Sequence, residues 1–150
     1  QENFYFDTRA QNPNEKKSQS VPVFIKHDGL VSALYKRQYI ETAQRFSDVP
    51  KLTTKQIEAL DMVDSLCNDT EFCFDIKLKP GDMEIANNAT TFHSRENYHD
   101  YDDINKRRCM LRLWLSLYDG RPLPDAYEDT REWAATFQRR KEIKNFIKAV

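Results

Sequence analysis

Three basic side chains in the second half of the chain have the types and spacing needed to bind a metal ion and a small dianion. His93 follows a threonine pair at the start of a polar stretch, and Arg108 and Arg112 lie beside and within an apolar run. A neutral imidazole is a common ligand for mid-row metals, and non-haem iron takes two histidines and one carboxylate. The alternative for His93 is a hydrogen-bonded structural histidine, because a lone histidine is weak evidence for a metal.

Arg112 is the hardest of the three to place without a ligand. It lies in the run MLRLW at residues 110–114, where burying a guanidinium is costly unless an anion meets it. In a regular strand Arg112 shares a face with Met110 and Trp114, and Arg108 lies on the same side four residues earlier. Two arginines spaced in this way can hold the two carboxylates of a small dianion. The alternative is an internal salt bridge to an acidic side chain.

The elements that must position these side chains are predicted to be mainly short strands. Alternating or β-branched apolar residues predict strands at residues 4–6, 21–25, 71–78, 83–87 and 109–116. Turn formers mark His27-Asp28-Gly29 and Pro80-Gly81-Asp82, and residues 7–20 predict an exposed loop.

Two helices are expected to cover these strands. Apolar residues at helical spacing predict the first over residues 30–46. Thr53 and Gln56 form a capping-box pattern that starts a second helix reaching Cys67. The charged tail after Pro124 also has helical spacing. We therefore expect one domain at residues 1–124 and a charged helical tail at residues 125–150.

Composition excludes several classes of protein. The chain has 150 residues, 39% of them hydrophobic, which is enough for one modest core. A balance of 23 basic and 24 acidic residues argues against a nucleic-acid surface at Arg107, Arg108 and residues 139–141. No run approaches the roughly 18 apolar residues of a membrane span. Three cysteines without CxxC spacing favour reduced thiols and a cytoplasmic location.

Longer motifs connect the candidate residues to a known family. The segment PGDMEIANNATTFHSRENYHD, followed by KRRCMLRLWLS and GRPLP, resembles the C-terminal part of the TauD/TfdA-like family of Fe(II)- and 2-oxoglutarate-dependent dioxygenases. The similarity runs from about Val21 to Pro124 and is strongest after Pro80. It implies a mainly β fold with flanking helices, namely the C-terminal part of a double-stranded β-helix, or jelly-roll.

The resemblance also implies roles for single residues. His93 matches the distal histidine that ligates Fe(II), Arg112 the arginine that pairs with the far carboxylate of 2-oxoglutarate, and Arg108 the arginine near its keto-acid end. Asn88 and Arg95 are weaker candidates for contact with the substrate or with the ligands. The implied activity is oxidation of a small organic substrate by O2, with succinate and CO2 formed. Substrate identity is left undetermined, and a homo-oligomer is left open.

One departure from the family pattern bears on activity. The family takes its first two iron ligands from an HxD motif well upstream of the distal histidine, yet none of His27, His93 and His99 is followed by Asp or Glu two residues later. The chain also begins at Gln1 and runs at once into the aromatic segment 4–6. We therefore expect a piece of a longer protein that is inactive alone. The alternative is a truncated or non-catalytic jelly-roll that binds a small anion.

Overall fold

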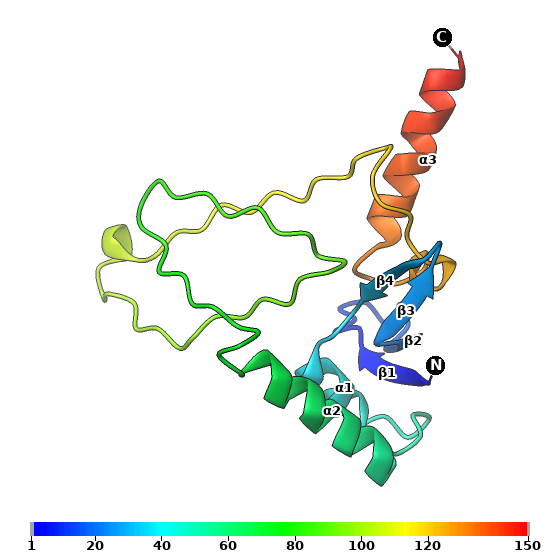
Figure 1. The fold of residues 1–150 in the computed structure, drawn as a ribbon, viewed down its shortest axis with the longest axis horizontal. Coiled ribbons are helices and arrows are strands. Elements are labelled where there is room, and N and C mark those ends of the chain that lie inside the picture. Colours follow the sequence, from blue (N-terminus) through cyan, green and yellow to red (C-terminus); the bar gives the residue numbers. More distant parts are fainter. Residues whose placement is uncertain (1, 150) are drawn as a thin grey trace.

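The computed structural model describes residues 2–149, which form two small antiparallel sheets, three α-helices and a long irregular segment. Helices α1 and α2 lie on one side of the strands, and α3 extends from the other side (Figure 1). The elements in chain order are β1 (Asn3–Asp7), β2 (Ser18–Pro22), β3 (Phe24–His27), β4 (Leu30–Ala33), α1 (Arg37–Ala43), α2 (Thr54–Cys67), the 3-10 helices η1 (Ile104–Lys106) and η2 (Asp125–Tyr127), and α3 (Ala134–Ala149).

The first hairpin supplies much of the hydrophobic core. β1 pairs with β2 so that Phe4 lies opposite Val21, and the connecting loop is shorter than the predicted 7–20, because Asp7 and residues 18–20 belong to the strands. Alternate apolar residues of these strands turn to the same face and are removed from water together, which stabilises the pairing. The buried core cluster comprises Phe4, Phe6, Val21, Val23, Ile25, Leu34, Ile40, Leu60 and Tyr127.

The second hairpin corrects the first predicted helix. Asp28 and Gly29 have φ of 48° and 75°, the left-handed conformation at both positions that a two-residue hairpin turn requires. This turn places Leu30 opposite His27 and makes residues 30–33 a strand. The helix predicted over 30–46 is therefore wrong at both ends, since α1 covers only Arg37–Ala43 and residues 44–46 form a turn and a bend. The apolar residues of that stretch have helical spacing, but the turn brings residues 30–33 beside β3, and hydrogen bonding to β3 makes them a strand.

Helix α2 begins as predicted. The Thr53 hydroxyl accepts a hydrogen bond from the Gln56 N–H at 3.2 Å, and the Gln56 side chain accepts one from the Thr53 N–H at 3.0 Å. These reciprocal bonds satisfy two of the donors that a helix N-terminus leaves unpaired. Leu60 is the residue of α2 that enters the core.

The start of the tail also packs on the core. Tyr127 is buried and its ring stacks on that of Trp133 with centroids 6.0 Å apart. Glu132 accepts hydrogen bonds from Gln19 at 2.7 Å and from Lys36 at 3.0 Å, which joins the tail to β2 and to the start of α1. The division at residue 124 stays a prediction, although these contacts connect its two sides.

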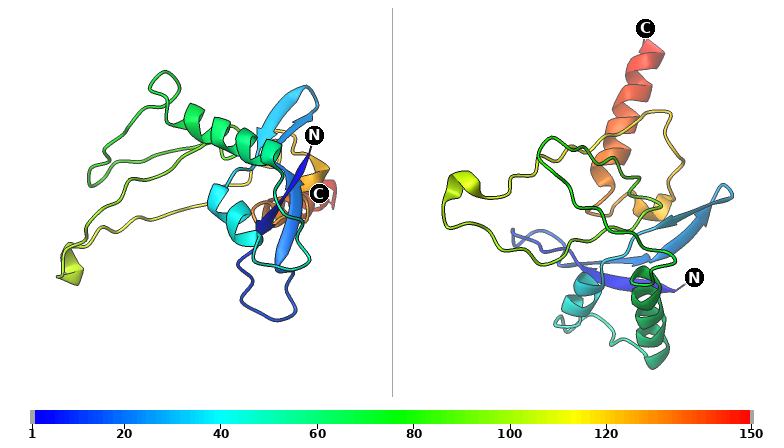
Figure 2. Two further views of the ribbon diagram at one scale, coloured as in Figure 1. Left: turned by 90° about the horizontal axis from the view of Figure 1, so that it is seen from below. Right: turned by 60° about the vertical axis from the view of Figure 1, so that its left-hand side comes forward.

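Residues 68–120, hereafter the open segment, project away from the packed elements in both views of Figure 2. The structure contains no strand at 71–78, 83–87 or 109–116, where three were predicted. Apart from one bond to Ala89, the backbone–backbone hydrogen bonds described in this segment close local turns. Strands require a hydrogen-bonding neighbour, and residues 2–149 offer none here. The short hairpins are compatible with the predicted jelly-roll but do not form one.

Candidate functional site

The open segment contacts the packed body, residues 2–67 and 121–149, just before His93, and again where the Ser116 hydroxyl donates to the Thr136 hydroxyl of α3 at 3.3 Å. The Ala33 N–H at the end of β4 donates to the Ala89 oxygen at 2.9 Å. Three residues later, the Phe92 ring packs against Phe24, with centroids 6.1 Å apart, and against Tyr35, at 5.6 Å. His93 itself is exposed, and the preceding Asn88 is half-buried. The hairpin β3–β4 therefore holds the residues that lead into His93.

Tyr35 is held in turn by a network of charges between α1 and α2. Its hydroxyl donates to Asp64 at 2.5 Å, and Arg37 pairs with Asp64 at 3.1 Å, with Asp61 at 2.8 Å and with Glu41 at 2.7 Å. Burial, and secondly the Asp64 carboxylate, raises the pKa of Tyr35 above its ordinary value. The hydrogen bond to Glu41 raises the pKa of Arg37. Tyr35 therefore stays a neutral donor with a fixed ring.

A second group of contacts joins residues 95–100 of the open segment to Arg108. The guanidinium of Arg95 lies 4.8 Å from the centre of the Tyr98 ring, and that of Arg108 lies 5.4 Å from it. The Arg108 N–H also donates to Asp100 at 3.2 Å. Two cations on one aromatic ring are attracted by its quadrupole. Tyr98 thus brings together two of the predicted site residues.

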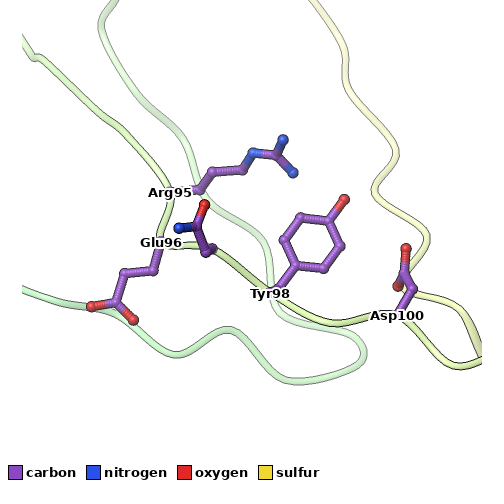
Figure 3. A pocket seen from close by; sticks show the side chains of 5 residues that line it. Arg95, Glu96, Tyr98 and Asp100 are labelled. Atoms are coloured by element: carbon purple, nitrogen blue, oxygen red, sulfur yellow. The ribbon is translucent and has the colours of Figure 1, made fainter.

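These residues border a shallow, polar pocket. It has a volume of about 410 Å³ and is lined by Arg95, Glu96, Asn97, Tyr98 and Asp100. Figure 3 shows the Arg95 guanidinium and the Tyr98 hydroxyl on one side of the chain, with the Glu96 carboxylate pointing away from them. The pocket therefore presents the Arg95 cation and the Tyr98 hydroxyl, with the Asp100 carboxylate also in its lining.

Arg112 lies elsewhere in the open segment and is exposed, with exposed Met110 and Trp114 beside it. The enclosed face predicted for it is not formed by residues 2–149, and Arg112 makes no ion pair with any acidic group among them. The internal salt bridge considered as its alternative is therefore absent from the described chain. The roles of His93, Arg108 and Arg112 remain predictions.

The residues described here do not by themselves form an iron site. Within residues 2–149, no three side chains of the His, Cys, Asp and Glu types lie close enough together to hold a metal ion. The His27 imidazole lies 3.6 Å from the Asp28 carboxylate at the turn between β3 and β4. This pair is far from His93 in the sequence. Non-haem iron takes three protein ligands, and among the described residues His93 is the one predicted to be such a ligand.

Sequence patterns did not indicate Tyr35, Phe92 or Tyr98 as contributors. Tyr35 and Phe92 are apolar or aromatic residues of the kind expected in any core, so nothing in their local pattern marks a role. Tyr98 lies in the polar stretch between His93 and Arg108, which also contains Tyr101, so no local signal distinguishes it.

Comparison with known proteins defines the class. The family model described as "Taurine catabolism dioxygenase TauD, TfdA family" matches residues 2–114, so the chain belongs to this family of non-haem iron and 2-oxoglutarate-dependent oxygenases. The match confirms the resemblance inferred from the sequence motifs. No solved structure matches the chain. Among the described residues, no helix is both long and apolar enough to cross a membrane.

Two curated relatives make the comparison more specific. The chain is 30% identical over 138 residues to FR-33289 synthase of Streptomyces rubellomurinus, covering 86% of this chain and 39% of the relative. It is 30% identical over 102 residues to the taurine hydroxylase-like protein SAT17 of Stachybotrys chartarum, covering 66% of this chain and 26% of the relative. The chain therefore spans less than two fifths of the length of either relative.

Proposed function

We propose that this chain is part of an Fe(II)- and 2-oxoglutarate-dependent oxygenase in which His93 is one of the three iron ligands. The family match supports this most strongly, because it extends to residue 114 and includes His93, Arg108 and Arg112. The reaction would be hydroxylation, or a related oxidation, of a small organic substrate by O2, with 2-oxoglutarate converted to succinate and CO2.

The other two iron ligands are assigned to polypeptide outside these 150 residues. FR-33289 synthase is matched over only 39% of its length, so most of that relative has no counterpart here. The open segment also has the surface that additional strands would need. Phe74, Leu111 and Leu113 are exposed, and the backbone around them has no strand partner in the described chain. Extended backbone with alternating apolar side chains is the type of edge to which strands add. The 150 residues alone are expected to be inactive.

The two arginines are proposed to bind the cosubstrate. A guanidinium stays charged at any physiological pH and binds a carboxylate through two parallel hydrogen bonds. Arg112 has no acidic partner within residues 2–149, and once added strands enclose it, its charge would need an anion from the added polypeptide or from a ligand. We assign Arg112 to the far carboxylate of 2-oxoglutarate and Arg108 to its keto-acid end.

The second candidate is a non-catalytic relative that binds a small anion through the same arginines. The lack of a three-ligand metal group within residues 2–149 favours it. It predicts anion binding that does not depend on iron, which separates it from the oxygenase.

The test uses the full-length polypeptide that contains this sequence, under anaerobic conditions. Fe(II) is added with and without 2-oxoglutarate, and the visible charge-transfer band of the chelate is recorded. We expect a band that requires both components, is lost in His93→Ala and is retained in His99→Ala. His99 is the matched control because it is an exposed histidine six residues away in the same segment. Arg112→Ala should raise the concentration of 2-oxoglutarate needed by about tenfold, the loss of one charged hydrogen-bonding partner.

Each outcome decides between the candidates. A band lost only in His93→Ala supports the oxygenase. Absence of the band in a folded protein that still binds 2-oxoglutarate would establish the non-catalytic alternative. A band that survives His93→Ala unchanged would overturn the assignment of His93.

A further inference from the structure

The contact of Phe92 with the body stands out against the rest of the open segment. Among the described residues from 68 to 120, Ala89 alone is buried, at 2% exposure. Its oxygen accepts the Ala33 N–H, and Phe92 packs on Phe24 and Tyr35. A segment that is mostly exposed is thus attached to the body at the four residues that immediately precede His93.

We propose that Phe92 is a positioning residue for His93, and that Tyr35 is the support that holds Phe92. This inference rests on the proposed role of His93 as an iron ligand. Residues 91–100 contain no helix or turn, so no regular backbone structure fixes His93 and the neighbouring contact of Phe92 is what ties it to the body. Phe92 is the immediate neighbour of His93, so a Phe92 ring held against Phe24 and Tyr35 limits the positions that the backbone of His93 can take.

The support behind Phe92 is rigid because each part of it has a second partner. Tyr35 donates to Asp64 at 2.5 Å, and Asp64 also pairs with Arg37 at 3.1 Å. Arg37 is held further by Glu41 in α1 at 2.7 Å. The ring that Phe92 meets is therefore fixed by both helices. Groups that orient a metal ligand influence metal affinity strongly, since a ligand that must be ordered on binding loses conformational entropy.

A change at Phe92 should affect Fe(II) binding and 2-oxoglutarate binding differently. Phe92 adjoins the proposed iron ligand, whereas Arg108 is held by Tyr98 and Asp100, outside this contact. Loosening Phe92 should therefore weaken Fe(II) binding while leaving 2-oxoglutarate binding, measured with Fe(II) saturating, within about twofold of the unmodified protein.

The experiment measures Fe(II) affinity, 2-oxoglutarate affinity and the position of the charge-transfer band in the full-length polypeptide. Phe92→Ala should weaken Fe(II) binding by about tenfold or more, the range seen when groups that orient a metal ligand are removed. It should also shift the band at saturating iron. Phe92→Leu, which keeps apolar bulk against Tyr35, should recover most of the affinity. Phe146→Ala is the matched control, because that phenylalanine is exposed on α3.

Tyr35→Phe provides a second variant that keeps the ring and the fold. It removes the hydroxyl that binds Asp64, and we expect a smaller loss of Fe(II) affinity, in the same direction as Phe92→Ala. If His93→Ala weakens Fe(II) binding and neither Phe92→Ala nor Tyr35→Phe does, the positioning role is overturned while the proposed function stands. If His93→Ala itself has no effect on Fe(II) binding, the proposed function fails, and the positioning role fails with it.

Discussion

The packed body comprises residues 2–67 and 121–149. Its local sequence patterns resemble those of the open segment, but the two regions have different structures. The alternation Phe4, Tyr5, Phe6 becomes a strand in the body, whereas Phe72, Cys73, Phe74 in the open segment does not. Both runs place apolar residues on one face of an extended chain. The first has β2 as a hydrogen-bonding partner, and the second has no neighbour within residues 2–149. Alternation predicts the face that a strand buries, and a partner decides whether the strand forms.

The largest expected contrast is in the response to loss of an apolar side chain. Phe6→Ala in the body should destabilise the chain by about 3–5 kcal/mol, because Phe6 is 1% exposed and its removal leaves a cavity. Leu111→Ala in the open segment should change stability by less than about 0.5 kcal/mol, because Leu111 is 92% exposed. Urea unfolding of the 150-residue chain measures both. Equal losses would show that residue 111 is buried in solution and would break the comparison.

A smaller contrast concerns helix caps. Thr53→Ala removes the hydroxyl that caps α2 and should cost about 1 kcal/mol. Asp103 caps η1 in the open segment in a similar way, through the Asn105 N–H at 3.0 Å, yet Asp103→Ala should leave the urea midpoint unchanged. A local turn outside the cooperative unit contributes nothing to global unfolding. A midpoint that falls equally in both variants would mean that the open segment unfolds together with the body.

The smallest contrast depends on pH. Burial raises the pKa of Tyr127 to about 12, and its hydroxyl has no hydrogen-bond partner among the described residues. The folded state therefore keeps this proton after the unfolded chain has lost it near the ordinary value of 10.0, so stability falls as pH rises from about 10 to about 12. Tyr127→Phe should match or exceed the unmodified protein in stability at pH 7, by up to about 1 kcal/mol. It should also flatten the alkaline decline.

Tyr101→Phe is the control for this pH dependence, since Tyr101 is exposed in the open segment. Thermal unfolding between pH 8 and pH 11 should show the same alkaline decline in Tyr101→Phe as in the unmodified chain. An undiminished decline in Tyr127→Phe would assign it to other groups, of which Tyr35, also with a raised pKa, is the first to examine.

Local signals in the sequence predicted the elements that depend on a few neighbouring residues. The Asp28-Gly29 turn and the Thr53–Gln56 capping box are examples, since each is set by hydrogen bonds or backbone angles within four residues. The start of α1 was missed because residues 30–33 carry both a helical and a strand-compatible pattern, and the preceding turn decided between them. Tertiary pairing of this kind overrides local propensity.

Candidate site residues could be selected from the sequence, where their roles stay predictions, but their arrangement could not. His93, Arg108 and Arg112 were selected by residue type and by a motif that the family match confirms as a family resemblance. The contacts that support them, Phe92 on Tyr35 and two arginines on Tyr98, join residues up to 57 positions apart in the case of Phe92 and Tyr35. Periodicity describes one segment at a time and contains no information about such pairs.

The attachments to strand β4 determine how freely the length of residues 90–120, which contain the candidate site, can vary. Ala33 binds the Ala89 oxygen, and the neighbouring Ser32 accepts hydrogen bonds from Arg121 at 3.3 Å, so one short strand holds both ends of residues 90–120. The entropy of closing a loop grows only with the logarithm of its length, about 0.6 kcal/mol for each doubling. Insertions or deletions between these two attachments therefore cost the body little. A family member can change the length and shape of the segment that carries the candidate site while its packed core stays the same.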